Sequence, residues 1–289
     1  MSRRLRRTGR ARSLLSALQS ILSAFVWLAA VILALHLNAG AATVVLLGTT
    51  ILFLGLYVLR PLRVQPRVAA HLRLRSCRRY LPWLAVATGM KLVLGLSTLV
   101  LHDRLAARRL LPQLPDDTDI VAPEFLAQPL GPVALFLALA VAAPLIEEFA
   151  FRGRAQHTLE HAFGAIPAIT ASAIVFSVLH GRVDAVHHLA FGVFAGWVVW
   201  RTGSIWSAVF MHALNNAAAQ LLMSLSTNDS PSSDASAAVW PYAIAGGVAG
   251  LAGLIATGLR INRIAREHRP VFHRGRALHT SAVAISSLR

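Results

Sequence analysis

The chain has 289 residues, of which 56% are hydrophobic and only 14% are charged. Soluble domains carry about 25% charged residues, so this composition excludes an ordinary soluble domain and favours a membrane protein. The formal net charge of +16 would suit nucleic acid. However, the arginines cluster between apolar runs and at both ends, without a nucleic-acid-binding motif. We therefore expect a lipid bilayer, and no nucleic acid, as the partner of these charges.

Apolar runs follow one another along most of the chain, and several exceed the roughly 18 residues that cross a bilayer. They lack the two-residue alternation of strands, and a helix satisfies its own backbone groups in lipid. The sequence thus predicts an all-α integral membrane protein, a bundle of about eight transmembrane helices. The expected spans are 16–38, 42–59, 80–102, 130–151, 166–183, 187–200, 205–223 and 239–259.

The first run follows six arginines and precedes an A-x-A pattern at Ala39–Ala41, which together resemble a signal peptide. It is longer than an ordinary signal-peptide core, so we expect an uncleaved span. The segments that would face the cytoplasm carry 23 basic residues and the opposite ones carry 3. This asymmetry predicts that both termini lie in the cytoplasm.

Three parts of the chain are expected from this pattern. Residues 1–129 would hold the first three helices and an extracytoplasmic loop, 130–223 a core of four helices, and 224–289 the last helix and a basic cytoplasmic tail. The polar stretches 103–129 and 224–238 read as irregular loops, and 152–165 as a short amphipathic helix at the cytoplasmic interface. The single cysteine, Cys77, excludes a disulfide framework and a cysteine-based metal site.

Ionisable residues within the spans call for an explanation, because charge is costly in lipid. Glu147 and Glu148 end the fourth run, and Arg152 lies one helical turn beyond Glu148. His180 follows Phe176 by one turn in the fifth run. Taken singly, each has a plain reading, as an interfacial glutamate or a hydrogen-bonded structural histidine.

His212 and Asn216 share one face of the seventh run, and alone they could simply join helices by hydrogen bonds. Together with Glu147 and His180 they form a more specific set. A glutamate and a histidine can activate water, and a second histidine and an amide can stabilise an oxyanion. These are the parts that amide hydrolysis needs.

The three clusters resemble the motifs of the CPBP family, the CAAX prenyl endopeptidase and bacteriocin-processing membrane proteins, also called the Abi family. Glu147, Glu148 and Arg152 match its EExxxR motif, and Phe176 and His180 match FxxxH. His212 and Asn216 match HxxxN, and the stretch from Phe191 to His212 is similar to the family's approach to that motif. The resemblance covers about residues 130–223.

The resemblance implies roles for these residues. Glu147 would activate water with His180, while His212 and Asn216 would stabilise the oxyanion. Glu148 would belong to the catalytic set and, with Arg152, orient the site, which Phe176 would help to shape.

Members of the family have been described as metalloproteases and as glutamate proteases. The chain has no HExxH motif of a classical zinc protease, although Glu147, His180 and His212 are chemically suited to bind zinc. We favour a mechanism without a cofactor. By residue counting, Glu147 would lie shallow and His180 deep in the bilayer. The two meet only if 152–165 enters the membrane, or if the helices tilt and start deeper.

Lys91 lies near the middle of the third span, where it would snorkel, line a cavity or pair with a glutamate. His187 and His188 flank the sixth span and are expected at the interface rather than as metal ligands. Two GxxxG pairs, Gly192 with Gly196 and Gly246 with Gly250, predict close helix packing within the chain or between subunits, with packing within the chain as the default.

We therefore predict an intramembrane endopeptidase that acts on membrane-associated peptides or proteins, as a multi-pass protein of a bacterial plasma membrane. The alternatives are a non-catalytic immunity or partner protein and a proton-coupled transporter. A transporter usually shows repeated halves or broken helices, which the sequence does not. The substrate, its cleavage site and the oligomeric state do not follow from the sequence.

Overall fold

A computed structural model describes residues 3–34, 36–56, 73–107, 123–180, 185–225 and 233–267. Within these ranges the chain is almost entirely helical, and the only β-type pairing is an isolated bridge between Leu74 and Ser204. The predicted all-α class is confirmed.

The helices follow one another in the order that the apolar runs predict. Their bounds are α1 Arg3–Ala34, α2 Ala39–Leu54, η2 Arg78–Tyr80, α5 Leu81–Ala107, α6 Pro123–Leu126, α7 Gly131–Phe136, η3 Leu137–Ala142, α8 Ala143–Glu148, η4 Phe149–Gln156, α9 His157–Phe163, α10 Ala165–Leu179, α11 Ala185–Thr202, α12 Trp206–Leu225 and α13 Ser233–Glu267.

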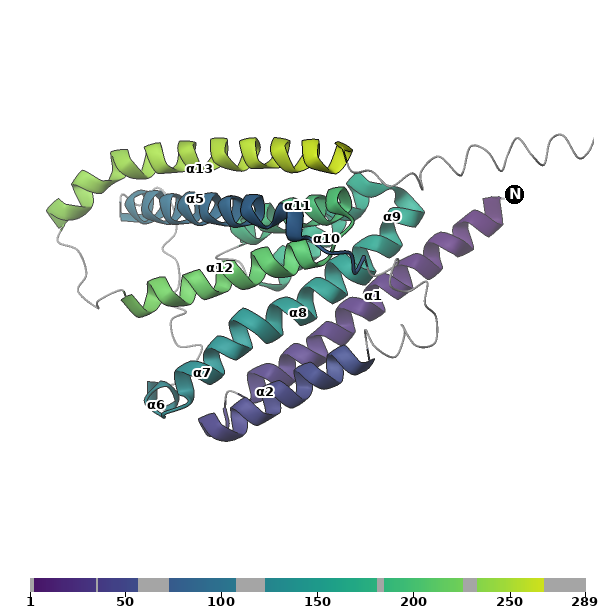
Figure 1. Cartoon of the computed structure of the whole chain (residues 1–289), viewed down its shortest axis with the longest axis horizontal. Helices are drawn as coiled ribbons and strands as arrows, with labels where there is room; N and C mark the ends of the chain where they lie inside the picture. Colours follow the sequence, from purple (N-terminus) through teal and green to yellow (C-terminus); the bar gives the residue numbers. More distant parts are fainter. Residues whose placement is uncertain are drawn as a thin grey trace, which may run out of the picture.

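A continuous rod from α7 to α9 runs through the middle of the bundle (Figure 1). Helices α1 and α2 cover one side of it, while α12 and α10 pack on the other. The rod is 61% buried over its most apolar window, against 22% for the other three long apolar helices. Residues on the rod are therefore the ones most shielded from the surroundings.

The rod corrects one prediction. Residues 152–165 are not a separate amphipathic helix at the interface, because the fourth apolar helix continues to Phe163. Arg152, Gly153, Ala155 and Gln156 are all buried in this extension. This extension packs against α1 and against α10.

Both GxxxG pairs pack against helices of the same chain, as the default interpretation expected. A Cβ on Gly250 would lie 2.8 Å from the Met90 carbonyl oxygen, which shows how closely α13 approaches α5. A Cβ on Gly192 would lie 3.0 Å from that of Ala173, where α11 crosses α10. Small residues permit this approach. The two long helices α5 and α13 lie side by side along most of their length (Figure 1).

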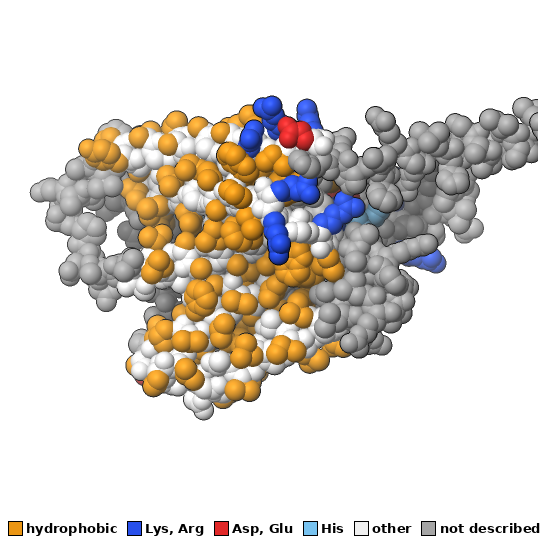
Figure 2. Space-filling view, in the orientation of Figure 1, with side chains coloured by type: hydrophobic (Ala, Val, Ile, Leu, Met, Phe, Trp, Pro, Cys, Tyr) orange, Lys and Arg blue, Asp and Glu red, His pale blue; other side chains and the backbone are white. Residues whose placement is uncertain are grey.

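Four helices are long and apolar enough to cross a membrane: Arg10–Leu33, Arg78–His102, Gly131–Phe163 and Pro241–Glu267. Helices α2 and α10 are apolar but shorter. The face in Figure 2 is covered by hydrophobic side chains, with basic side chains gathered near the C-terminal end of α13. The protein is an all-α membrane protein. Eight complete crossings remain a prediction, although each predicted span falls on a helix.

Several helices run further than the predicted spans and reach into the segments expected to be irregular. Helix α5 extends past residue 102 to Ala107, and α12 reaches Leu225. Helix α13 begins at Ser233, within the expected loop 224–238, and ends at Glu267, within the expected tail. Helix α6 forms inside the expected loop 103–129. The tail from 268 and the acidic cluster at 116–119 lie outside the described residues.

The start of α1 and the end of α13 lie at the same end of the bundle (Figure 1). This agrees with a topology in which both termini are on one side. Their location in the cytoplasm stays a prediction from the arginine asymmetry, which persists when the buried Arg152 is left out of the count.

Candidate active site

Three helices bring the predicted residues together. The rod supplies Glu147 and Glu148 at the end of α8 and Arg152 in η4. His180 caps the C-terminal end of α10, and His212 lies in the second turn of α12. Two π-helical segments, η3 and η4, flank α8 on the rod. Such turns are frequent at functional sites because they redirect side chains and loosen the backbone ladder.

Residue counting placed Glu147 shallow and His180 deep, but the extension of the rod to Phe163 brings the two residues level. Gly164, with φ of 90°, forms the turn between the rod and α10, a conformation that glycine adopts without strain. Glu147 precedes this turn by 17 residues and His180 follows it by 16. At 1.5 Å per residue both lie about 25 Å along their antiparallel helices. Residues 152–163 continue the rod, so Glu147 and His180 can meet, while the entry of this segment into the membrane stays a prediction.

Glu147 is where the cluster converges. Its Oε2 lies 3.6 Å from His180 Nε2 and 3.9 Å from His212 Nε2. The Glu147 and His212 side chains are each 7% exposed, whereas that of His180 is 27% exposed. The carboxylate therefore faces two imidazoles in a largely dry site, with His180 on the open side.

A second carboxylate holds His212 from behind. Glu148 Oε1 lies 2.9 Å from His212 Nδ1 and accepts a hydrogen bond of 3.0 Å from Arg152 Nη1. The side chains of Glu148 and Arg152 are fully buried. With Nδ1 engaged by Glu148, the His212 ring is fixed so that its Nε2 points at Glu147.

Phe176 packs between the polar groups. Its ring centroid is 4.3 Å from that of His180 and 5.9 Å from that of His212. The Arg152 guanidinium lies over the same ring, 4.3 Å from its centroid, in a favourable cation–π arrangement. His180 Nδ1 is 2.7 Å from the Phe176 carbonyl oxygen, so its Nε2 is the nitrogen that faces Glu147.

Residues 129–218 match the family model for type II CAAX prenyl endopeptidase Rce1-like proteins. This match supports the predicted resemblance to the CAAX-protease family over that segment. This segment begins two residues before α7 and ends within α12, so it contains the whole cluster around Glu147. No curated protein and no solved structure matches the chain.

The Rce1-like segment supports an intramembrane protease of the CAAX type. It also places the chain in a membrane, together with the four long apolar helices.

Asn216 makes hydrogen bonds to groups outside the cluster around Glu147. Its Nδ2 donates to the Leu139 carbonyl oxygen in η3 at 2.8 Å, and its Oδ1 accepts from Asn215 Nδ2 at 3.1 Å. A carboxamide has two N–H donors. The bond to Leu139 ties α12 to the rod, and a role at the oxyanion would use the second donor.

His188 is a neighbour of the site, although the sequence predicted no role for it there. Its ring stacks on that of His180 with centroids 4.2 Å apart and an interplanar angle of 20°, while its expected position at the membrane interface stays a prediction. His188, Gly192 and Gly196 are spaced four residues apart on one face of α11. Since the glycines mark the face that packs on α10, this spacing was a signal that could have found it.

Phe191 begins the stretch that leads to the HxxxN motif, and the sequence predicted no role for it. Its ring lies edge-on to His212 with centroids 5.1 Å apart, and Lys91 Nζ lies 5.5 Å from its centroid on the other side. Phe191 therefore separates the glutamate–histidine cluster from a neighbouring cavity. Lys91 lines that cavity and donates to Asn215 Oδ1 at 2.7 Å. Of the three expected roles, which were snorkelling, lining a cavity and pairing with a glutamate, the structure thus shows the second.

The proposed zinc ligands, Glu147, His180 and His212, do converge. Two ligands of one tetrahedral zinc ion lie about 3.3 Å apart, given metal–ligand bonds of about 2 Å. The distances of 3.6 and 3.9 Å from Glu147 Oε2 are wider than this. Within the described ranges no group of three or more His, Cys, Asp or Glu residues has the geometry of a metal site. As placed, these residues are spaced too widely to hold a zinc ion.

Proposed function

We propose that the chain is an intramembrane endopeptidase in which Glu147 and His180 activate water and His212 stabilises the oxyanion. The observation that carries this proposal is the convergence of two imidazole Nε2 atoms on one buried carboxylate oxygen, Glu147 Oε2. Such an arrangement supplies a general base and a hydrogen-bond donor at one point.

The reaction would proceed by direct attack of water on the peptide carbonyl. Water held between Glu147 and His180 transfers a proton to Glu147 as its oxygen bonds to the carbonyl carbon. The oxyanion accepts a hydrogen bond from His212 Nε2–H, and the second donor of Asn216 is the candidate for another. Glu147 then returns the proton to the amide nitrogen, the C–N bond breaks, and a carboxylic acid and an amine are released.

Glu148 and Arg152 would act through His212. Glu148 Oε1 is positioned to accept a hydrogen bond from Nδ1–H of His212 at 2.9 Å. With a proton on Nδ1, Nε2 donates to the oxyanion only when the ring is an imidazolium, whose charge the Glu148 carboxylate would stabilise. Arg152 balances the charge of Glu148 in a fully buried pair. Glu148 is thus proposed as a positioning residue rather than as a group that contacts substrate.

The substrate is proposed to be a membrane-associated peptide or protein, since the site lies on the most buried of the long apolar helices. The proposed location is a bacterial plasma membrane. The mechanism needs no cofactor, and a zinc-dependent reaction through the same three residues is the competing form of the proposal.

The test is cleavage of a quenched-fluorescence library of membrane peptides by the purified chain in detergent. Glu147→Gln and His180→Gln should each lower the rate by about 10²–10⁴-fold, the usual contribution of general acid–base groups. The matched controls are Glu124→Gln and His36→Gln, which change exposed residues outside the cluster. Both should cleave at the wild-type rate.

Three outcomes bear on the proposal. If the Glu147→Gln variant elutes as a folded protein and still cleaves at the wild-type rate, Glu147 is not the general base. Loss of activity in chelator with recovery on adding zinc would replace the metal-free mechanism by the zinc-dependent one. Absence of cleavage by the wild type across the library would favour a non-catalytic partner protein.

A further inference from the structure

Three hydrogen bonds made by side chains lead from α5 through α12 to the rod. Lys91 Nζ donates to Asn215 Oδ1 at 2.7 Å, and Asn215 Nδ2 donates to Asn216 Oδ1 at 3.1 Å. Asn216 Nδ2 then donates to the Leu139 carbonyl oxygen in η3 at 2.8 Å. We call the side chains of Lys91, Asn215 and Asn216 the amide chain. It ends one helical turn after His212, at Asn216.

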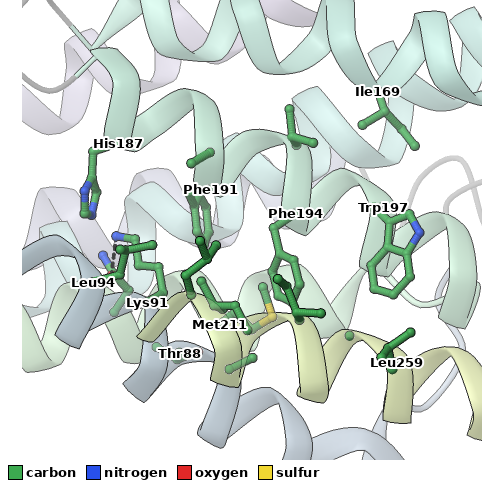
Figure 3. Close-up of a pocket in the computed structure, with 18 of the residues that line it drawn as sticks. Thr88, Lys91, Leu94, Ile169, His187, Phe191, Phe194, Trp197, Met211 and Leu259 are labelled. Carbon is green, nitrogen blue, oxygen red and sulfur yellow. Dashed lines mark hydrogen bonds between the residues drawn. The ribbon is translucent and has the colours of Figure 1, made fainter. Parts of the chain in front are cut away.

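The amide chain begins in the wall of the neighbouring cavity, which has a volume of about 730 Å³. Lys91 and Asn215 both line this cavity, and Figure 3 shows Lys91 at the end opposite Trp197 and Leu259. Most of the other lining residues are apolar. In apolar surroundings a hydrogen bond is stronger than in water, and a wrongly paired polar group costs correspondingly more. The orientation of each carboxamide in the chain is therefore strongly specified.

The donor at the start of the amide chain decides how both carboxamides face. A carboxamide has an oxygen that accepts and a nitrogen that donates, whereas an ammonium group only donates. Lys91 therefore requires the oxygen of Asn215, which turns Asn215 Nδ2 toward Asn216. Asn216 must then meet that nitrogen with its own oxygen, so its Nδ2 points elsewhere. If either carboxamide turned over, two donors or two acceptors would face each other.

The far end of the amide chain specifies the same orientation. The Leu139 carbonyl oxygen accepts from one of the two N–H groups on Asn216 Nδ2. The second N–H is the one that the proposed mechanism assigns to the oxyanion. The carboxamide of Asn216 is thus placed by an acceptor on the rod and by a cation on α5. The EExxxR, FxxxH and HxxxN motifs specify neither Lys91 nor Asn215.

We infer that Lys91 is a positioning residue of the peptidase, acting through Asn215 to keep the second N–H of Asn216 directed at the oxyanion. This inference rests on the oxyanion role of Asn216 in the proposed function. It adds that the role depends on a helix outside the Rce1-like segment, since α5 ends at Ala107 and the match begins at residue 129.

The variant Asn215→Asp, in the purified full-length chain in detergent, tests the direction of the amide chain. A carboxylate is close in shape to a carboxamide and still accepts from Lys91 Nζ, but it has no N–H to offer Asn216. The Asn216 carboxamide should then turn its nitrogen toward the carboxylate. For the library peptide that wild type cleaves fastest, kcat should fall by about 10²-fold, as for loss of an oxyanion donor. KM should stay within about twofold of wild type, and the melting temperature should stay near it.

The variants Lys91→Met and Lys91→Arg test the start of the amide chain. Methionine removes the donor, so Asn215 can turn over, and kcat should fall roughly tenfold, as expected for one hydrogen bond to a charged group. Arginine only donates and should restore most of kcat. In an Asn216→Ala background, Lys91→Met should have no further effect on kcat, because the two changes remove the same interaction.

The matched control is Thr88→Val. Thr88 also lines the cavity from α5, but its hydroxyl donates to the Leu84 carbonyl oxygen of its own helix at 2.9 Å. This variant should cleave at the wild-type rate.

The possible failures are distinguishable. Wild-type kcat in a folded Asn215→Asp variant overturns the positioning role and leaves the proposed function standing. An effect of Lys91→Met that is equally large with and without Asn216→Ala does the same, because it indicates packing alone. If wild type cleaves no peptide, the proposed function fails and the positioning role fails with it. If Asn215→Asp does not fold, the comparison of Lys91→Met with Lys91→Arg decides.

Discussion

At the scale of single residues, Glu148 and Arg152 illustrate why the site is also a stability element. Both side chains are fully buried, and each is placed by the other and by His212. Two atoms of the guanidinium, Nε and Nη2, and Glu148 Oε2 are buried without a hydrogen-bond partner, so the ring of Phe176 under Arg152 has to offset part of this cost. A buried pair of this kind is expensive to split.

Arg152→Met should therefore destabilise the protein strongly, because it leaves the Glu148 carboxylate buried and uncompensated. Breaking a buried pair costs about 3–5 kcal/mol, which should appear as a large fall in melting temperature in detergent. The double variant Glu148→Gln/Arg152→Met should recover part of the loss. Arg263→Met serves as the control, since it opens the exposed pair with Glu267, and it should melt near wild type. A single variant as stable as this control would contradict the assignment.

The motifs predicted which residues form this cluster but not which of them contact one another. Spacing of four residues places Glu148 beside Arg152 on one helix, and the structure agrees. The contact of Glu148 with His212 joins residues 64 positions apart, and no local pattern encodes it. The same holds for Asn216, which is bound to Leu139 and not to the groups of its presumed role.

At the scale of elements, close helix packing depends on where glycine replaces a side chain. Gly246, Gly250 and Gly253 form a stripe on α13, and a Cβ on any of them would meet atoms of α5 within 3 Å. Helix α5, which carries Lys91, also packs against α12, and α13 packs against α11. The GxxxG pattern predicted such a contact, while the partner helix emerged only from the fold.

Gly250→Ala should loosen the α5–α13 pair, because its Cβ would lie 2.8 Å from the Met90 carbonyl oxygen and 3.0 Å from the Leu94 nitrogen. Overpacking of this kind costs about 1–3 kcal/mol and should lower the melting temperature. Gly89→Ala is the matched control, since nothing lies within 4 Å of its Cβ on α5 and alanine favours a helix over glycine. The idea fails if both variants melt alike.

At the scale of the whole molecule, residues 73–80 close one end of the bundle. Ile205 N donates to the Arg73 carbonyl oxygen at 2.9 Å, and Leu74 bridges Ser204 across the turn between α11 and α12. Arg73 also pairs with Glu160 on α9. Cys77 belongs to this segment, and its side chain is buried. The single cysteine therefore reports on docking between distant parts of the chain.

Cys77 should react slowly with maleimide in the native protein and rapidly once it unfolds. Burial raises the pKa of the Cys77 thiol above its ordinary value, so near pH 8 less of the reactive thiolate is present than at an exposed cysteine. Labelling during a temperature ramp in detergent measures this. The control is Ser76→Cys/Cys77→Ser, which moves the thiol to an exposed neighbour and should label quickly before melting. Equal native rates for the two proteins would show that the segment is not docked.

Composition and the length of the apolar runs sufficed to predict an all-helical membrane protein, because a chain in lipid must satisfy its backbone within each helix. The motifs likewise named Glu147, Glu148, Arg152, Phe176, His180 and His212 as the residues that meet. Tertiary structure alone set the extension of the rod to Phe163, the stacking of His188 on His180 and the cavity at Lys91. The physical reason is that lipid is as apolar as a helix interface, so hydrophobicity along the chain does not distinguish a buried helix face from one exposed to the membrane.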